Sequence, residues 1–276
     1  MTNRTIYNIF KRGSRTYFYN SLFFPQDIKE DVFTLYSFVR RADDYVDSLP
    51  QRPGHFRRFR RNFLNALEGD QTGDVVADSF AKLSIRKGFD ERWHDSFLQA
   101  MESDLTKHNY DTLEEVEDYM YGSAEVIGLY MAKIMELPKK AYPHARHLGK
   151  SMQFINFIRD IDEDLKLGRT YMPKDVLSRH GLTSLDFEAT SIRPGKFRSF
   201  IKDIVGICWG WQRTAEKGYR YLPRKYLVPI MNAAEMYKWT AKRIVTDPFV
   251  IYKEKVKPSV PRIVLNYGFN ALTAAN

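Results

Sequence analysis

Two pairs of aspartates stand four residues apart, in two distant parts of the chain. Asp43 and Asp47 belong to the run DDYVD, and Asp160 and Asp164 belong to the run RDIDED. Side chains at positions i and i+4 of a helix share one face, so each pair would hold two like charges close together, which disfavours the helix. Carboxylates bind hard divalent cations, and Mg²⁺ takes one or two of them while phosphates and water complete its shell. Mn²⁺ is the alternative ion, and DDYVD alone is equally typical of a solvated helix face.

Other polar residues accompany both pairs on the same predicted faces. Tyr36 and Arg40 precede the first pair at helical spacing, and Gln153 and Asn156 precede the second, with Arg159 directly before its first aspartate. Solubility alone poorly explains a face that carries Gln and Asn beside two aspartates. Two such helices, facing each other across a cavity, would hold a diphosphate through metal ions while Arg and Lys neutralise the remaining oxygens. This arrangement would serve the departure of a diphosphate.

The elements that must position these residues are helices. Helical periodicity dominates the chain, and the alternation typical of strands is nearly absent. From Pro25 to Ser48, apolar residues recur at steps of four and three, which predicts one long helix carrying the first pair. No repeat or linker divides the chain, so we expect one all-α domain over residues 1–276, with an irregular insertion at 168–195. Further helices are predicted at 53–68, 74–87, 90–107, 112–136, 139–166, 196–221 and 225–244.

Composition excludes several classes of protein. The chain has 276 residues and 43% hydrophobic content, enough to bury a core, which excludes intrinsic disorder. The one cysteine, Cys208, cannot form an intrachain disulfide, and no Cys/His cluster suits zinc. No apolar run would span a bilayer and no signal peptide is evident, so we expect a cytoplasmic protein. The net charge of +9 favours anionic partners, but the dispersed basic residues carry no nucleic-acid-binding signature, so no nucleic-acid partner is expected.

Five sequence blocks together resemble the squalene and phytoene synthase family, the head-to-head isoprenyl diphosphate synthases. They are SRTYFYNSLFFP at 14–25, YSFVRRADDYVD at 36–47, MESDLTKHNYDT at 101–112, YMYGSAEVIG at 119–128 and QFINFIRDIDEDLKLGRTYMP at 153–173. The blocks follow in order over nearly the whole chain, which makes the resemblance specific. It implies an all-α isoprenoid-synthase bundle around a central cavity, Mg²⁺ dependence, and condensation of two identical allylic diphosphates through a cyclopropylcarbinyl diphosphate.

The resemblance also implies roles for the residues that match the family's motifs. The four aspartates would hold Mg²⁺ against the substrate diphosphates, and Arg40 would contact diphosphate oxygens. Ser14 and Thr16 match small hydroxyl residues that cover the diphosphate, and Tyr237 matches a further aromatic residue that contacts substrate. The residues that would line the reaction centre are Tyr36, Tyr121, Gln153, Asn156 and Arg159.

The chain departs from the family pattern in two places. Glu125 replaces a small residue four positions after Tyr121, and it would either change the electrostatics of the cavity or add a carboxylate near the metal. For Tyr121 itself, a place in the hydrophobic core is the alternative to the reaction centre. The C-terminal basic segment matches the family only loosely, so no role is assigned to Lys253, Lys255, Lys257 and Arg262.

Several products are compatible with the resemblance. We favour phytoene made from two molecules of geranylgeranyl diphosphate, with no requirement for NADPH; squalene or dehydrosqualene from farnesyl diphosphate is the alternative. A non-catalytic homologue that binds prenyl lipids or protein partners is disfavoured because all four aspartates are present. The positive charge and a water-insoluble product predict reversible association with anionic membranes. Room for a C20 chain is expected beside the small residues Gly122, Ser123, Ala124 and Gly128.

Overall fold

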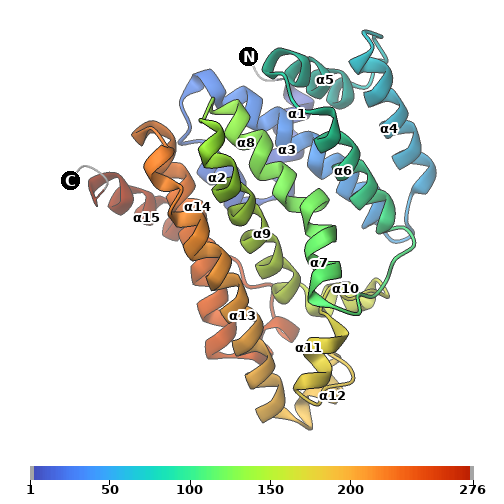
Figure 1. Cartoon of the computed structure of the whole chain (residues 1–276), viewed down its shortest axis with the longest axis vertical. Helices are drawn as coiled ribbons and strands as arrows, with labels where there is room; N and C mark the ends of the chain where they lie inside the picture. The colour runs from blue at the N-terminus through green and yellow to red at the C-terminus, as the bar shows by residue number, and fades with distance from the viewer. Residues whose placement is uncertain (1–2, 274–276) are drawn as a thin grey trace.

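The computed structural model describes residues 3–273, which form helices and connecting segments with no β-strand in that range (Figure 1). The all-α prediction is therefore confirmed. The α-helices are α1 (Arg4–Gly13), α2 (Arg15–Ser21), α3 (Gln26–Val46), α4 (Pro53–Leu67), α5 (Val75–Lys87), α6 (Glu91–Ser103), α7 (Leu113–Met120), α8 (Val126–Ile134), α9 (Tyr142–Arg159), α10 (Ile161–Lys166), α11 (Lys174–Arg179), α12 (Phe187–Ser191), α13 (Pro194–Glu216), α14 (Arg224–Thr246) and α15 (Val260–Thr273). The π-helical segment η1 (Tyr121–Glu125) joins α7 to α8, and 3₁₀ turns lie at η2 (Lys139–Ala141), η3 (Tyr219–Tyr221) and η4 (Pro248–Tyr252).

Helix α9 lies at the centre of the bundle, between α8 on one side and α13 and α14 on the other (Figure 1). Helix α3 packs against α1, α4 and α5, and α15 crosses α14 and α2 at the opposite side of the molecule (Figure 1). The buried apolar side chains form one continuous cluster that extends from Ile6 to Val256. Residues far apart in sequence therefore share a single core.

Helix α3 forms as its sequence pattern predicts. It starts after Pro25, whose fixed φ suits a helix start, and its apolar stripe, which includes Ile28 and Leu35, is buried. The helix ends at Val46, so Asp43 lies in its last turn and Asp47 directly follows it. This places the first aspartate pair at the C-terminal end of the helix.

Two glycines allow α9 to pack unusually closely against α8 and the π-helical segment η1. A Cβ atom on Gly128 would lie 2.2 Å from the carbonyl oxygen of Ala145, and one on Gly149 would lie 2.3 Å from the carbonyl oxygen of Ala124. Any larger residue would force the two backbones apart. The small residues near Ala124 thus serve helix packing as well as space.

Several boundaries differ from the prediction. Helix α9 stops at Arg159 and a new helix, α10, starts at Ile161, so the expected helix 139–166 is broken at Asp160. The expected helix 112–136 contains the π-helical segment η1 and ends at Ile134. The interval 168–195 contains the short helices α11 and α12, although no helix is predicted there.

Helices α1, α2 and α15 are not predicted by the sequence pattern. The two N-terminal helices are short, and they are separated only by Ser14, which caps α2 by accepting a hydrogen bond from the Tyr17 amide (3.3 Å). No helix within residues 3–273 is both long and apolar enough to cross a membrane.

Candidate active site

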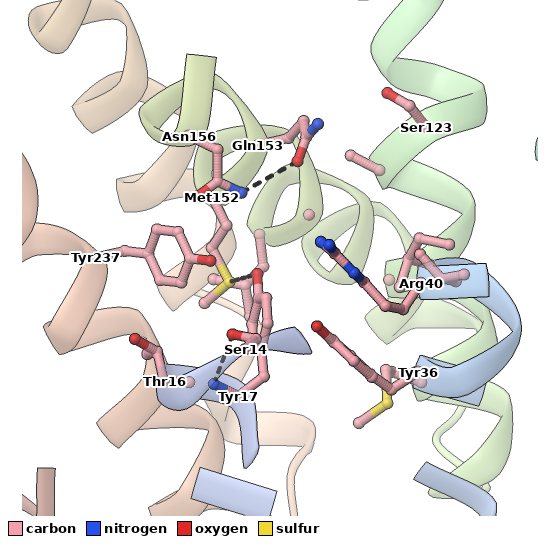
Figure 2. Close-up of a pocket in the computed structure, with 18 of the residues that line it drawn as sticks. Ser14, Thr16, Tyr17, Tyr36, Arg40, Ser123, Met152, Gln153, Asn156 and Tyr237 are labelled. Atoms are coloured by element: carbon pink, nitrogen blue, oxygen red, sulfur yellow. Dashed lines mark hydrogen bonds between the residues drawn. The ribbon is translucent and has the colours of Figure 1, made fainter. Parts of the chain in front are cut away.

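A cavity of about 560 Å³ runs between α2, α3, α8, α9 and α14 (Figure 2). Charged side chains, among them Asp43, Asp47 and Asp160, line one end, which we call the polar end. The opposite, apolar end is lined by Phe24, Val32, Met131, Met135, Leu137, Leu222 and Ile230. The shape suits a ligand with a highly charged head and a long apolar chain.

Asp43 and Asp47, the first aspartate pair, both line the polar end. Burial and the charge of Asp47 raise the pKa of Asp43 well above its ordinary value, although the nearby Arg40 guanidinium opposes that rise. Arg40 lines the cavity, but its ion pair is with Asp44, at 2.7 Å between Nη2 and Oδ1. The resulting carboxylate cluster is only partly neutralised by protein cations.

The second aspartate pair has a different electrostatic environment. Arg159 donates two hydrogen bonds to Asp160, from Nε to Oδ1 at 2.8 Å and from Nη2 to Oδ2 at 2.6 Å. The Nζ atom of Lys255 lies 3.3 Å from Oδ1 of the same carboxylate. Burial alone would raise the pKa of Asp160, but the contacts with Arg159 and Lys255 outweigh burial and lower it. For Asp164, burial and the charge of Asp160 raise the pKa to about 8. The pair therefore contains one neutralised carboxylate and one that resists ionisation.

A buried arginine and a buried aspartate, neither predicted from the sequence to have a role, also lie at the polar end. Arg169 is 4% exposed; its Nη2 donates to Asp47 Oδ1 at 2.5 Å, and its Nη1 lies 4.0 Å from Asp104 Oδ1. Asp104 accepts hydrogen bonds from Tyr119 (2.6 Å) and Tyr171 (2.8 Å), and burial raises its pKa to about 7. Both residues lie inside blocks that carry the family resemblance, so the blocks were the available signal.

The polar end fits divalent cations that are shared with a phosphate ligand. No group of three or more His, Cys, Asp and Glu side chains in residues 3–273 forms a ready metal cage. Burial is the largest cause of the raised pKa values of Asp43 and Asp164, and the neighbouring charges of Asp47 and Asp160 add to it, as do the C-terminal ends of α3 and α9. Mg²⁺ needs only one or two protein carboxylates when phosphates and water supply its other ligands. The donor set therefore suits Mg²⁺ brought together with a diphosphate.

The middle of the cavity is polar and aromatic at once (Figure 2). Asn156 donates a hydrogen bond to Gln153 Oε1 at 3.2 Å, while its own Oδ1 is buried without a partner. The rings of Tyr17 and Tyr237 lie 5.6 Å apart, and Tyr36 stacks on Phe10 with centroids 3.9 Å apart. Figure 2 shows Tyr17, Tyr36 and Tyr237 lying around the same space as Gln153 and Asn156. An unpaired buried acceptor in a cavity indicates a place for a ligand's donor or a bound water.

Most of the remaining predicted residues line the cavity, but Tyr121 and Gly122 do not. Ser14, Thr16 and Arg159 line it, as do Ser123, Ala124 and Gly128. Tyr121 is not among the lining residues; the guanidinium of Arg146 lies over its ring at 5.1 Å. The expectation that Tyr121 borders the reaction centre is therefore not met by its position, and Tyr119 lines the cavity instead.

Glu125 also lies outside the cavity lining. It is 3% exposed and pairs with Arg146 (2.6 Å) and Lys150 (2.8 Å), so its charge is balanced away from the aspartates. The expectation that it adds a carboxylate beside the metal is corrected by these two ion pairs. Gly122 likewise does not line the cavity, because a Cβ there would lie 2.2 Å from the Ser96 carbonyl oxygen of α6.

Two basic residues of the unassigned C-terminal segment reach the polar end. Lys255 and Lys257 both line the cavity, and Lys255 contacts Glu163 as well as Asp160. Burial lowers the pKa of Lys257. Both ammonium groups are suitably placed to meet an anionic ligand.

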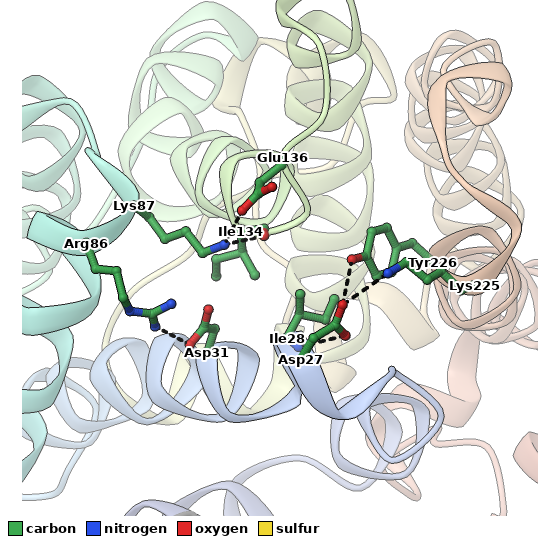
Figure 3. Close-up of polar contacts among 9 residues, drawn as sticks. All are labelled: Asp27, Ile28, Asp31, Arg86, Lys87, Ile134, Glu136, Lys225 and Tyr226. Atoms are coloured by element: carbon green, nitrogen blue, oxygen red, sulfur yellow. Dashed lines mark hydrogen bonds and ion pairs between the residues drawn. The ribbon is translucent and has the colours of Figure 1, made fainter.

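Salt bridges at the apolar end tie α3 to α14 and to α5, and α5 to the segment after α8 (Figure 3). Asp27 of α3 accepts from Lys225 of α14 at 3.0 Å, and Asp31 accepts from Arg86 of α5 at 2.5 Å. Lys87 donates a hydrogen bond to Glu136 at 2.8 Å. Glu136 follows α8, and its neighbours in sequence, Met135 and Leu137, line the cavity. Methionines line the cavity here, and ion pairs connect the helix ends around it.

Comparison with known proteins agrees with this geometry. Residues 10–263 match the family model described as squalene/phytoene synthase. The 15-cis-phytoene synthase of Paracoccus sp. (strain N81106) is 28% identical over 258 residues, which cover 90% of this chain and 84% of the relative. The phytoene synthase of Thermus thermophilus is 28% identical over 209 residues, covering 74% of this chain and 70% of the relative.

Solved structures share the fold at lower identity. A dehydrosqualene synthase in complex with a ligand superposes with a TM-score of 0.85 at 20% identity, covering 98% of this chain and 95% of the other. A squalene synthase from Alicyclobacillus acidocaldarius superposes with a TM-score of 0.76 at 20% identity, covering 89% of this chain and 95% of the other. These likenesses establish the arrangement of helices.

Proposed function

Because the chain belongs to the squalene/phytoene synthase family and is a prenyltransferase of that type, we propose that it condenses two geranylgeranyl diphosphate molecules head-to-head to phytoene. The observation that carries this proposal is the single cavity that joins a carboxylate- and guanidinium-rich polar end to a long apolar end. A prenyl diphosphate has the same two-part chemistry. Its diphosphate would occupy the polar end and its chain the apolar end.

The polar end would serve the departure of diphosphate. The bond between the allylic carbon and the diphosphate oxygen breaks, and its electron pair leaves with the oxygen. Asp43, Asp47, Asp160 and Asp164 are the residues that would hold Mg²⁺, which when bound neutralises the leaving oxygens. Arg40, Lys255 and Lys257 would bind oxygens that remain exposed, and Arg159 would keep Asp160 ionised and oriented.

The middle of the cavity would shelter the allylic cation. The rings of Tyr17, Tyr36 and Tyr237 present π faces, which attract positive charge. Burial raises the pKa of Tyr17 and Tyr237, so both hydroxyls stay protonated. The surrounding apolar walls exclude water that would quench the cation. Gln153 and Asn156 would orient the reacting groups through their amides.

The cavity also bears on chain length. Ala124, Gly128 and Ser21 are small residues in its lining, and the flexible side chains of Met131 and Met135 line its apolar end. A C20 chain is longer than a C15 chain, so small and adaptable residues favour the longer substrate. The names of the curated relatives, which are phytoene synthases, support the same choice.

The second candidate is the formation of squalene or dehydrosqualene from farnesyl diphosphate. The structural match to a dehydrosqualene synthase at a TM-score of 0.85 favours it. Squalene formation needs a hydride donor such as NADPH, whereas phytoene and dehydrosqualene formation do not. The two candidates therefore differ in substrate length and in their dependence on a reductant.

One experiment separates the candidates. The purified protein is incubated with Mg²⁺ and equal amounts of farnesyl and geranylgeranyl diphosphate, with and without NADPH, and the hydrocarbons are identified by mass. We expect a C40 hydrocarbon in both conditions. A preference for farnesyl diphosphate, or a C30 product that appears only with NADPH, would contradict the phytoene assignment and leave head-to-head condensation intact.

A further inference from the structure

Helix α15 carries its polar residues toward the protein. Asn266 donates to Glu235 at 2.5 Å, and Asn270 donates to the same carboxylate at 2.7 Å. On the same inner face, Ile263 is fully buried and the ring of Tyr267 stacks on Phe23 with centroids 3.7 Å apart. The helix is therefore held to α14 and α2 largely by amide hydrogen bonds and one ring stack.

The apolar residues of α15 face outward. Leu265 is 75% exposed, Leu272 is 74% exposed, Phe269 is 63% exposed and Val264 is 47% exposed. Their spacing places them on one face, which we call the α15 face. A surface helix of a soluble domain normally has the opposite arrangement, with its apolar stripe toward the core. The inversion calls for an apolar partner outside the chain.

We propose that the α15 face docks the enzyme on the surface of a lipid bilayer that contains anionic headgroups. A helix that lies in a membrane interface inserts one apolar face to a shallow depth and is flanked by basic residues. Around the α15 face, Arg262 is exposed on the helix itself, and Arg224 donates to the carbonyl oxygen of Ala271 near its C-terminal end. Neither arginine forms an ion pair with a carboxylate in the part of the chain that the structure describes.

The charge pattern of the sequence around the face supports an anionic lipid surface. No acidic residue follows Glu254, so Arg262 has no carboxylate in its own segment, whereas Lys255 and Lys257 belong to the polar end of the cavity and are not part of these flanks. Arg262 would therefore meet lipid phosphates without a competing carboxylate in the same segment. The face and its flanks together match the composition of an interfacial helix.

A second copy of the chain is a poorer occupant. Helix α15 has 14 residues, so at 1.5 Å per residue it is about 20 Å long, and a strip one helix wide covers about 200 Å². A stable protein interface buries about 800 Å² on each partner. The α15 face alone is too small for such an interface, whereas shallow insertion into lipid has no such minimum.

The position of the face also suits the product, on the basis of the proposed function. Helix α15 packs on α14 near Asn232, whose side chain donates to the Ile263 carbonyl oxygen at 3.0 Å. The neighbouring residues Pro229, Ile230 and Ala233 of α14 line the cavity. A water-insoluble hydrocarbon formed there would have a lipid phase close to the apolar end of the cavity.

Vesicle flotation tests the proposal directly. The full chain is mixed with phosphatidylcholine vesicles, with or without one fifth phosphatidylglycerol, and the bound fraction is measured. We expect tighter binding to the anionic vesicles, and we expect the double variant Leu265→Ser/Leu272→Ser to bind them at least about 10-fold more weakly. The matched control is Ile85→Ser/Ile192→Ser, which removes two residues of 62% and 77% exposure on other surfaces and should bind as wild type does.

A site-specific probe shows which surface enters the lipid. Cys208 is fully buried, so the thiol of Leu265→Cys or Ile192→Cys can be labelled selectively with an environment-sensitive fluorophore. We expect a blue shift with anionic vesicles for the label at position 265 and none at position 192. Sedimentation of wild type and of the double variant, both without lipid, measures the oligomeric state.

Three results would overturn the proposal. They are wild-type protein that floats with neither vesicle, a Leu265→Ser/Leu272→Ser variant that binds as tightly as wild type, and a wild-type dimer that this variant dissociates, which would assign the face to a second copy. The double variant should keep wild-type product formation in detergent without vesicles, because neither residue lines the cavity. Failure of the wild type to make hydrocarbon there would count against the proposed function and leave the vesicle result standing.

Discussion

Asp164→Asn should stabilise the metal-free protein while abolishing its activity. Burial and the charge of Asp160 raise the pKa of Asp164 to about 8 from an ordinary value of 3.8. A carboxyl whose pKa is higher in the folded than in the unfolded state destabilises the fold when both states ionise it. That penalty is absent well below pH 3.8 and grows as the pH rises through the interval up to about 8. Asparagine has a similar shape and carries no charge, so it removes the repulsion.

The magnitude follows from the two pKa values. At 1.36 kcal/mol for each tenfold change in proton affinity, ionised Asp164 costs about 5 kcal/mol at pH 8.5. The side chain is only partly buried, so water screens the repulsion, and the buried amide of Asn also loses some hydration. We therefore expect a net gain of about 2 kcal/mol, which corresponds to a rise of about 4 to 8 °C in Tm for a chain of this size.

Thermal unfolding in EDTA at pH 8.5 and at pH 4 measures this effect. The gain should appear at pH 8.5 and nearly vanish at pH 4, where Asp164 is protonated in the folded state. Asp162→Asn is the matched control on α10, because Asp162 pairs with Lys166 at 2.5 Å and does not line the cavity. It should leave activity near the wild-type value and lower Tm slightly. A variant Asp164→Asn that is less stable than wild type at pH 8.5, or that retains turnover, would refute the reasoning.

Three further predictions concern the cation, the substrate and pH. Product formation should disappear in excess EDTA and return with Mg²⁺, because protein cations leave Asp43 and Asp164 without full neutralisation; full activity in EDTA would exclude the metal role. Ala124→Phe, which fills the cavity lining, should shift preference from the C20 to the C15 diphosphate in a competition read by product mass, whereas general destabilisation would lower both products alike. Burial lowers the pKa of His94 to about 4, so stability present above pH 6.5 should fall by up to about 3 kcal/mol as the pH drops toward 4, and His94→Gln should flatten that dependence in chemical denaturation.

The sequence pattern was most informative where one helix carries both its own apolar stripe and its functional residues. In α3, the stripe that includes Ile28 and Leu35 determines which face is buried, and the same periodicity places Asp43 beside Arg40 and Tyr36. Helix α9 behaves in the same way for Gln153 and Asn156. Local periodicity is enough to predict the direction of these side chains when the neighbouring helices only have to cover the apolar stripe of the same helix.

Tyr121, to which the family resemblance and not periodicity gave a role, marks the point after which helical periodicity fails. It lies at the start of the π-helical segment η1, which adds a residue to the turn and changes which side chains point inward after it. Extrapolating an α-helical face from Tyr121 through this segment therefore misassigns the inward side chains. Tyr119 lines the cavity in place of Tyr121, and Ser123 and Ala124 line it as expected from their small size.

Long-range pairs are a second reason why sequence reasoning stops short of the whole site. Arg169 and Asp47 are 122 positions apart, and nothing local in either segment indicates that the two side chains meet. The pair connects the end of α3 to the loop after α10, so it also fixes the spacing between the two acidic segments. Family blocks point to such residues, but only the folded chain shows which of them contact each other.

Helix α15 was not predicted because its polar face depends on a distant partner, Glu235, and this dependence bears on its function. Its apolar residues recur at helical spacing, but its inner face carries Asn266 and Asn270, which would be unfavourable in a core without Glu235 to accept their hydrogen bonds. When the polar residues of a helix face the protein and its apolar residues face outward, the sequence alone does not show which face is buried. Once Glu235 accounts for the polar face, Leu265 and Leu272 remain without a partner in the described chain, and this residual exposure is what a lipid surface would cover.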